Sequence, residues 1–420
     1  MMQEQPVKKR DVVFVCGYEI ARPEGHHRRF AKELPLFEAA WNVKTDLSPP
    51  AMDSRTNVAI WKLKTKGPNW QVDTDFRMFW WGDIIAPDFE MSNVRRFYVG
   101  VLALLDFVFS GAIVQYFRVN WRYALFFLYP YVFMAAAGFG GFYLARWAIG
   151  AAVPFADLIA VLVGLVCAFV MVALPPRPLY IGYVLNDWHF AHDLVYHRRV
   201  AVDQRLDGFA KELIDLVRNS TADEILIIGH SLGAVQAIDV VARARRLDPE
   251  FAARGKPVRI MTIGSSLLKI GLHPKAHQLR DAVREVANDP NIYWAEFQAM
   301  TDIVNFYKSD PVTDLGWPPA PMPIVQIVRV KHMLKTETYK GLKRDFFRVH
   351  RQFVMGNEQR YFYDYYMICG GPIALPQRVV YHEGVVEAFA PDGAFDPAKV
   401  ETGRMSKSEV PKSARKSKAS

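Results

Sequence analysis

Cysteine is scarce in this chain, and several common signatures are missing. The 420 residues include three cysteines, Cys16, Cys167 and Cys369, and no C-x-x-C pair, so neither a disulfide framework nor a thiolate zinc site is expected. Neither a G-x-G-x-x-G loop nor a Walker A loop is present, which argues against nucleotide chemistry. The first 30 residues begin with polar MMQEQPVKKR and lack the apolar segment of a secretory signal peptide.

Charge is modest in amount and uneven in position. Charged residues make up 23% of the chain and hydrophobic ones 51%, which favours a large folded core over disorder. Of the formal charge of +9, residues 404–420 supply six lysines and arginines against one glutamate. We therefore interpret 396–420 as a disordered basic tail and the rest as only mildly basic, so nucleic acid is not expected as a partner.

Histidines gather in one short segment. His189, His192 and His197 lie close to Asp187 and Asp193, but their intervals do not form the i, i+4 ligand pair of a zinc-binding helix. A solvated face near a membrane explains this segment better than a metal site does. We therefore expect neither a metal nor a cofactor.

A long apolar region interrupts the mixed pattern found on both sides of it. Residues 123–145 carry no charge, and residues 155–174 carry only Asp157. Each segment is long enough for a helix to cross a hydrocarbon core of about 30 Å. The sequence predicts a transmembrane hairpin.

The preceding segment, 97–118, is long enough to span a bilayer but places Asp106 near its middle, which is costly in lipid. We expect an interfacial helix here, because two parts of one soluble fold can meet only if the chain crosses the membrane an even number of times. Arginines flank the hairpin on both sides, whereas Arg146 is the only cation in its connecting turn. This distribution predicts a multi-pass protein of the cell membrane with both soluble parts in the cytoplasm.

Outside the apolar region, short β-like runs alternate with amphipathic helical segments. The expected strands lie at 11–18, 58–63, 224–229, 258–264, 291–300 and 324–330, and the expected helices at 27–40 and 205–219. Connections of this length predict an α/β fold with a mostly parallel sheet and helices on both faces, interrupted by the hairpin. The expected organisation is 1–94 and 177–395 as two parts of one fold, 95–176 as the membrane insertion and 396–420 as the tail.

A nucleophile motif follows one of these strands. The run Gly229-His230-Ser231-Leu232-Gly233 ends the strand at 224–229 and leads into a good helix. Small residues suit the tight, strained turn that exposes a catalytic serine, and the first amides of the following helix suit a developing oxyanion. The context of strand, G-x-S-x-G and helix predicts that Ser231 is a nucleophile and that the Leu232 amide is an oxyanion donor.

The segments GHSLGA, TIGSSL and Asp302-Ile303-Val304 together resemble the α/β-hydrolase superfamily, in particular its class 3 lipase-like branch, over about residues 10–70 and 200–355. The resemblance implies that the acid follows the strand after TIGS, which identifies Asp302, although Asp310 and Asp314 lie near enough to compete. A carboxylate at the C-terminal edge of a strand can orient an imidazole without entering the core.

Two histidines follow the last strand, His332 and His350, and position alone does not separate them. The resemblance implies an H-x-x-[YF] pattern at the final helix, which His350-Arg351-Gln352-Phe353 matches, so we prefer His350 as the base. The second oxyanion amide is expected from Tyr18 in the loop after the first strand. The family usually has His-Gly in that loop, and Cys16-Gly17 departs from it.

These features predict a membrane-anchored serine hydrolase of the lipase or esterase type, which cleaves a hydrophobic or lipid-like ester through an acyl-enzyme. The expected partners are a lipid-like substrate and the bilayer. The alternative is a membrane scaffold that keeps the hydrolase fold but has lost turnover.

Overall fold

The computed structural model describes residues 5–150, 153–174 and 179–402, which form two compact units. The sheet unit comprises Met1–Ile84, Val200–Gly271 and His277–Ser420, and the helical unit comprises Ile85–Arg199 and Leu272–Ala276. The helical unit thus begins before residue 95 and ends after residue 176, the expected limits of the insertion. It also takes in a short segment from much later in the chain.

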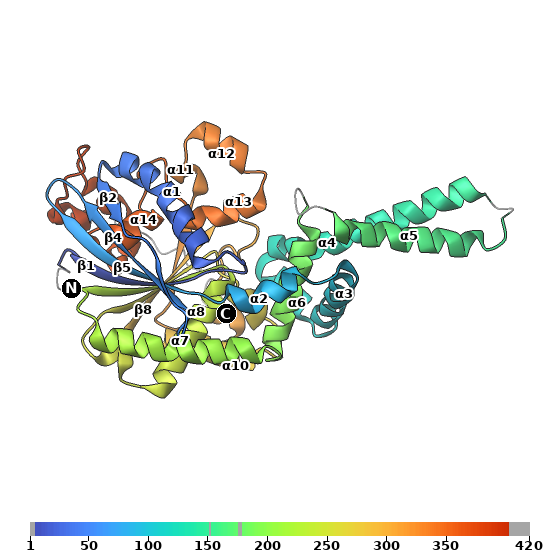
Figure 1. Cartoon of the computed structure of the whole chain (residues 1–420), viewed down its shortest axis with the longest axis horizontal. Coiled ribbons are helices and arrows are strands. Elements are labelled where there is room, and N and C mark those ends of the chain that lie inside the picture. Colours follow the sequence, from blue (N-terminus) through green and yellow to red (C-terminus); the bar gives the residue numbers. More distant parts are fainter. Residues whose placement is uncertain (1–4, 151–152, 175–178, 403–420) are drawn as a thin grey trace, which may run out of the picture. The chain divides into compact units, whose positions relative to one another are not determined.

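Nine strands among the described residues form one sheet in the sheet unit (Figure 1). Their bounds are β1 Lys9–Val15, β2 Lys44–Leu47, β3 Ala51–Asp53, β4 Val58–Lys66, β5 Gln71–Phe79, β6 Glu224–His230, β7 Val258–Ile263, β8 Ile292–Ala299 and β9 Ile324–Val328. The order across the sheet is β2-β4-β5-β1-β6-β7-β8-β9, and β3 pairs with β4.

The sheet is mixed, so the expectation of a mostly parallel sheet is wrong. Neighbours from β5 to β9 along this order are parallel, whereas β2, β3 and β5 all pair with β4 in the antiparallel sense. Only residues 67–70 separate β4 from β5, which is too short for a parallel crossover and forces a hairpin. The polar residues Asp73, Asp75 and Arg77 in β5 hid this strand from the sequence analysis.

Helices cover both faces of the sheet, with α1 and α14 on one face and α7 and α10 on the other (Figure 1). The helices of this unit are α1 Pro23–Trp41, α7 Val200–Asn219, α8 Leu232–Leu247, α9 Leu267–Gly271, α10 His277–Ala287, α11 Val330–Met333, α12 Thr336–Leu342, α13 Phe346–Arg351, α14 Tyr365–Gly370, α15 Leu375–Val380 and α16 His382–Glu387. Helix α2 Gly82–Phe89 contains the boundary between the sheet unit and the helical unit.

The registers of the central strands bring their C-terminal ends to one edge of the sheet. Val15 at the end of β1 lies opposite Gly229 of β6, and His230 lies opposite Ile263 at the end of β7. All seven residues of β6 are buried. The segments that follow these strands therefore meet at one edge, which is where parallel α/β sheets place their sites.

A buried ion triad lies at the opposite ends of the same strands. Glu224 begins β6, and its carboxylate accepts hydrogen bonds from Arg10 Nε at 2.6 Å and from an Arg259 guanidinium nitrogen at 2.7 Å. Burial opposes ionisation of Glu224, but the two arginines outweigh it and hold its pKa at about 2. The triad joins β1, β6 and β7 far from the edge that carries the site.

The helical unit contains α3 Asn93–Phe109, α4 Ala112–Ile149, α5 Ala156–Ala173 and α6 Ile181–Val195. The expectation of one helix over 97–118 is wrong, because Gly111 adopts a left-handed conformation (φ 79°) and separates α3 from α4. Within α4, Asn120 has a non-helical backbone (φ −150°, ψ 96°), so the apolar helix proper begins just after it.

Two helices among the described residues are long and apolar enough to cross a membrane, α4 with a mean hydropathy of 1.5 and α5 with 2.6. Only 28% and 22% of their most apolar windows are buried within the protein, unlike the core helices of a soluble fold. The two helices pack closely at glycines. A Cβ on Gly164 would lie 2.7 Å from the Gly138 carbonyl oxygen, and one on Gly141 would lie 2.6 Å from Cys167 Sγ. Small residues at such contacts are typical of membrane helix pairs.

Asp106 of α3 is held by polar side chains of its own unit. Its carboxylate accepts a hydrogen bond from the Tyr196 hydroxyl at 2.8 Å and lies 2.9 Å from His273 Nε2 and 3.5 Å from His192 Nε2. His273, which belongs to the late segment Leu272–Ala276, is fully buried. The cost expected for Asp106 in lipid is therefore avoided by contacts within the protein.

The expectation of disorder over 396–402 is wrong. The 3₁₀ helix η4 covers Pro397–Thr402, and Val400 is only 2% exposed. This apolar contact explains why the polar composition of 396–402 was misleading. The rest of the expected tail, 403–420, lies outside the described residues.

Candidate active site

Ser231 occupies a sharp turn between β6 and α8. Its backbone has φ 56° and ψ −122°, a conformation that residues other than glycine rarely adopt. Buried β6 fixes one side of the turn and the packed helix α8 fixes the other. The strain holds the side chain at the strand edge, as the strand–serine–helix motif predicts.

The two glycines of the motif are required by space. A Cβ on Gly229 would lie 2.5 Å from Ala234 Cα, and one on Gly233 would lie 2.2 Å from the Val15 carbonyl oxygen. Any larger side chain at either position would push the start of α8 away from β6 or from β1. The G-x-S-x-G spacing therefore reflects close packing of the helix onto the sheet.

The loop after β1 reaches the serine. A Cβ on Gly17 would lie 3.0 Å from Ser231 Cβ and 3.5 Å from its Oγ. Tyr18, the expected second oxyanion donor, follows Gly17 and is buried. Leu232 is the first residue of α8, where backbone amides have no acceptor within the helix. The structure thus brings both expected oxyanion segments to the region of Ser231.

The side chains of Asp302 and His350 are in contact although the two residues are 48 positions apart in the chain. His350 Nδ1 lies 2.7 Å from Asp302 Oδ2, and both side chains are buried. Asp302 is fixed in turn by the Val304 amide at 2.9 Å and by the Asn305 side-chain amide at 2.8 Å. With the Nδ1 proton donated to Asp302, the other ring nitrogen is left with a lone pair.

That second nitrogen, His350 Nε2, is buried and has no hydrogen-bond partner among the described residues. The imidazole lies beside the end of β7. The Ser231 amide donates to the Ile263 carbonyl at 3.0 Å, and a Cβ on the next residue, Gly264, would lie 2.8 Å from His350 Cε1. The imidazole of His350 and the backbone of Ser231 therefore lie beside the same end of β7.

The competing residues have other surroundings. Asp310 accepts hydrogen bonds from the amides of Val312 and Thr313, and Asp314 accepts one from the Asp310 amide, so both carboxylates stabilise a local turn. His332, on α11, is exposed, and its ring lies 5.7 Å from that of Tyr361. The structure thus brings Asp302 to His350 and joins neither to His332.

His230 is a site residue that the sequence analysis did not single out. Its ring stacks on that of His350 with centroids 4.9 Å apart, and its Nε2 lies 3.3 Å from the His350 carbonyl oxygen. Burial, together with the neighbouring His350, lowers the pKa of His230 well below its usual value, so His230 is neutral. Its place within the G-x-S-x-G motif was the available signal.

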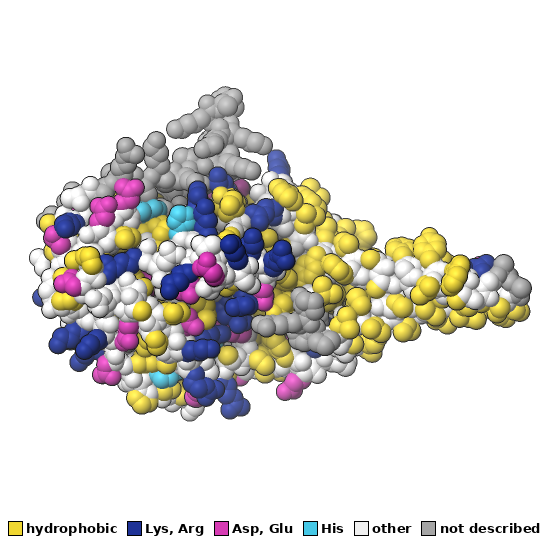
Figure 2. All heavy atoms as spheres, turned by 90° about the horizontal axis from the view of Figure 1, so that it is seen from above, with side chains coloured by type: hydrophobic (Ala, Val, Ile, Leu, Met, Phe, Trp, Pro, Cys, Tyr) yellow, Lys and Arg dark blue, Asp and Glu magenta, His cyan; other side chains and the backbone are white. Residues whose placement is uncertain are grey.

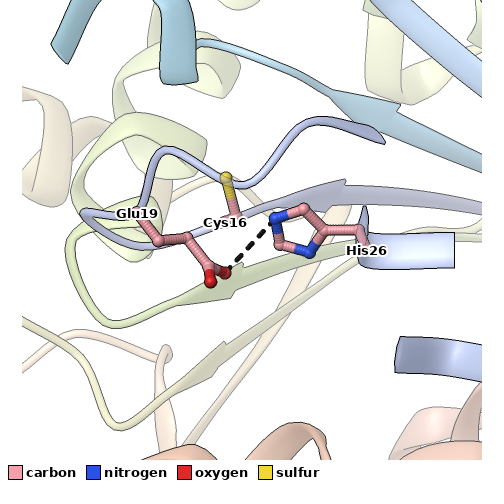
Figure 3. A group of neighbouring side chains, drawn as sticks. All are labelled: Cys16, Glu19 and His26. Atoms are coloured by element: carbon pink, nitrogen blue, oxygen red, sulfur yellow. Dashed lines mark ion pairs between the residues drawn. The ribbon is translucent and has the colours of Figure 1, made fainter. Parts of the chain in front are cut away.

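A second group missed by the sequence analysis lies between the loop after β1 and α1. Figure 3 shows Glu19 and His26 facing one another, with Cys16 on the same loop as Glu19. Arg29 donates to both Glu19 carboxylate oxygens at 3.0 Å, and His26 Nε2 lies 3.3 Å from one of them. Burial opposes ionisation of Glu19, but His26 and Arg29 hold its pKa at about 2.

Cys16, Glu19 and His26 bring possible metal-ligand atoms within 4.8 Å of one another, as His189, His192 and Asp193 do elsewhere. In the first group the Arg29 guanidinium already supplies the positive charge, and burial raises the pKa of the Cys16 thiol well above its usual value. In the second group an arginine, Arg199, donates to Asp193 at 2.7 Å. Both clusters are therefore satisfied by the chain's own cations.

No protein-family model, curated protein or solved structure matches this chain.

Proposed function

We propose that the chain is a membrane-anchored serine hydrolase that cleaves a hydrophobic or lipid-like ester. Ser231 Oγ attacks the acyl carbonyl while His350 Nε2 accepts its proton. Asp302 stays ionised and stabilises the imidazolium that forms. The amides of Leu232 and Tyr18 bind the oxyanion, and water then releases the acyl group with His350 returning the proton.

One observation carries this proposal. A serine in a strained strand-to-helix turn lies at the same sheet edge as a buried Asp–His pair whose outer nitrogen is bare. Maintaining the backbone strain and leaving a buried nitrogen unpaired both cost free energy. A base that must accept a proton explains the second cost, and a nucleophile held at the strand end explains the first.

The membrane part of the proposal is supported by exposed apolar side chains. Among the described residues, all but six of the exposed large hydrophobic side chains lie between Val94 and Leu174, and hydrophobic side chains dominate the surface of the helical hairpin (Figure 2). On α3, exposed residues recur at helical spacing, namely Val94, Tyr98, Leu102, Leu105 and Phe109. Such a face suits a helix lying against lipid.

In this proposal α4 and α5 cross the cell membrane and α3 lies at its surface. The sheet unit then faces the cytoplasm on one side of the bilayer, with both termini. Anchoring the site beside a bilayer raises the local concentration of a lipid substrate without any contact to it.

The test of the proposal is active-site labelling with a fluorophosphonate probe, together with hydrolysis of short-chain nitrophenyl esters by the reconstituted full chain. Ser231→Ala should abolish labelling and lower kcat by about 10⁴ to 10⁶. Ser54→Ala, which alters an exposed serine in the turn after β3, is the matched control and should label like the wild type. Labelling retained by Ser231→Ala would refute the nucleophile.

The second candidate is a membrane scaffold without turnover. The observation in its favour is that His350 Nε2 makes no hydrogen bond with the Ser231 hydroxyl. Catalytic hydrogen bonds often form only when substrate is bound, so we prefer the hydrolase. Absence of labelling in the wild-type chain would favour the scaffold.

A further inference from the structure

The segment that leads from β9 to His350 is strongly basic. Residues 329–351 contain eight lysines and arginines, all exposed, against the two carboxylates Glu337 and Asp345. The segment therefore carries a formal charge of +6, while the whole chain carries +9. It includes α11, α12 and α13, and we call it the cationic cap. The basic tail masks this segment in the overall charge of the chain, because 404–420 alone holds six lysines and arginines.

These cations differ from several arginines elsewhere in the sheet unit, which carboxylates hold in ion pairs. None of the eight side chains forms an ion pair with any residue that the structure describes. By contrast, Arg243 contacts three aspartates and Arg246 pairs with Glu285. Eight exposed cations within one short segment repel one another, and an anionic partner relieves this repulsion.

The cap is attached to the fold by apolar residues and carries aromatic side chains at its surface. Val330, Met333, Leu342 and Val349 are buried. Tyr339, Phe346 and Phe347 are half-buried among the exposed cations. Cations interspersed with half-buried aromatic rings suit the boundary between lipid headgroups and acyl chains.

The cap is directly connected to the candidate active site. Helix α13 carries the buried His350 and, on the same six residues, the exposed Arg348 and Arg351. Figure 2 views the protein from the side on which α12 lies in Figure 1, and Lys and Arg side chains gather on that face. A surface that binds the cap therefore lies close to the residue that we propose as the base.

We propose that the cationic cap docks onto an anionic lipid surface and that the ester cleaved at Ser231 is a lipid drawn from that surface. The inference deepens the proposed function and rests on it for the identity of the reaction. Charge complementarity favours an anionic partner, and the apolar hairpin in the same chain favours lipid over nucleic acid. Each cation near an anionic membrane surface adds to the attraction, and salt weakens it.

The experiment uses the full chain carrying Ser231→Ala, so that docking is measured without turnover. The protein is placed in nanodiscs of phosphatidylcholine, with or without phosphatidylglycerol, and hydrogen–deuterium exchange of the cap amides is followed. We expect exchange to slow by about tenfold in the anionic discs and to return to the neutral-disc rate in about 1 M salt.

Two matched variants test the charge. Lys340→Glu, Lys343→Glu and Arg344→Glu together bring the formal charge of the cap to zero and should abolish the slowing. The control replaces Lys44, Lys66 and Lys211, which are exposed and outside the cap, by glutamate and makes the same change in net charge. The control should keep the full slowing.

The docking proposal would be overturned if the cap amides exchanged at the same rate in neutral and anionic discs. It would also be overturned if the cap variant and the control variant lost the slowing in anionic discs to the same extent. A short RNA oligomer that slows exchange in neutral discs more than phosphatidylglycerol does would overturn the choice of lipid. None of these results depends on hydrolysis, so failure of the cap and failure of the hydrolase assignment are distinguishable.

Discussion

Gly264 offers a sharp test of where the base lies, because it combines a left-handed backbone with contact to the imidazole. Its φ is +53°, and a Cβ there would lie 2.8 Å from His350 Cε1 and 3.2 Å from Nδ1. Carbon atoms in ordinary contact are about 3.5–4.0 Å apart, so Gly264→Ala requires the imidazole to retreat by about 0.7 Å or more. The retreat also disturbs the 2.7 Å contact with Asp302.

The matched control is Gly255→Ala, in the turn before β7. Gly255 also has a positive φ of +85°, but a Cβ there would meet nothing within 4 Å. Both variants therefore incur the left-handed backbone cost of roughly 1–2 kcal/mol, and only Gly264→Ala displaces the imidazole. Misplacing a catalytic group by about 1 Å lowers the rate by about 10²-fold, so we expect kcat to fall by about 10- to 100-fold in Gly264→Ala alone.

The assay is nitrophenyl ester hydrolysis by both variants in the same lipid, with thermal unfolding recorded in parallel. Gly264→Ala should also unfold somewhat more readily than Gly255→Ala, because overpacking a buried site costs about 1–3 kcal/mol, but the protein should remain folded at the assay temperature and kcat should separate the two variants. If Gly264→Ala hydrolyses ester as fast as Gly255→Ala, the imidazole beside Gly264 is not the base and the site has been misassigned.

Three other expectations are open to measurement. His350→Ala should lower kcat by about 10⁴-fold or more, and it should lower the free energy of unfolding by about 1–3 kcal/mol because it leaves a buried carboxylate short of a partner. His332→Ala, at an exposed residue, should change the free energy of unfolding by less than about 0.5 kcal/mol and keep activity. The reverse pattern of activity would make His332 the base. Glu224, with its pKa lowered to about 2, contributes about 3 kcal/mol that is fully present above pH 4.5 and is lost as pH falls through 2. Glu224→Gln should remove that acid dependence and lower the free energy of unfolding at neutral pH by about 3–5 kcal/mol, and denaturant titrations at several pH values that show no difference from wild type would contradict the role of the triad. Reporters fused to the N- and C-termini should both report the cytoplasmic side, and opposite sides would exclude a two-crossing hairpin.

The local features of the site were predictable from the sequence, whereas those that depend on topology were not. The turn at Ser231 is specified within a few residues, by the glycines on either side and an apolar strand before them. The contact of Asp302 with His350 spans 48 residues, so the sequence alone left His332 open. The contacts of Glu19 with Arg29 were missed because nothing in the spacing shows that the loop after β1 folds back on α1.

The fold shows the same division. Apolar runs such as β6 and β7 were located within a residue or two, because buried parallel strands are almost continuously hydrophobic. Strand β5 escaped notice, because polar residues alternate along it and its hairpin with β4 depends on a short connection. The break at Gly111 was also missed, since apolar residues continue on both sides of it.

Because of the segment Leu272–Ala276, deleting one continuous stretch of the chain does not remove the whole helical unit. The segment belongs to the helical unit, so the chain passes between the units at four junctions, 84/85, 199/200, 271/272 and 276/277. Joining residue 84 to residue 200 would delete Asp106 and Phe107, against which the fully buried His273 packs. A soluble fragment made in this way would expose that segment, immediately after α9, to water. The helical unit is thus built from two separate stretches of the chain, and removing the longer stretch alone leaves the shorter one without its partners.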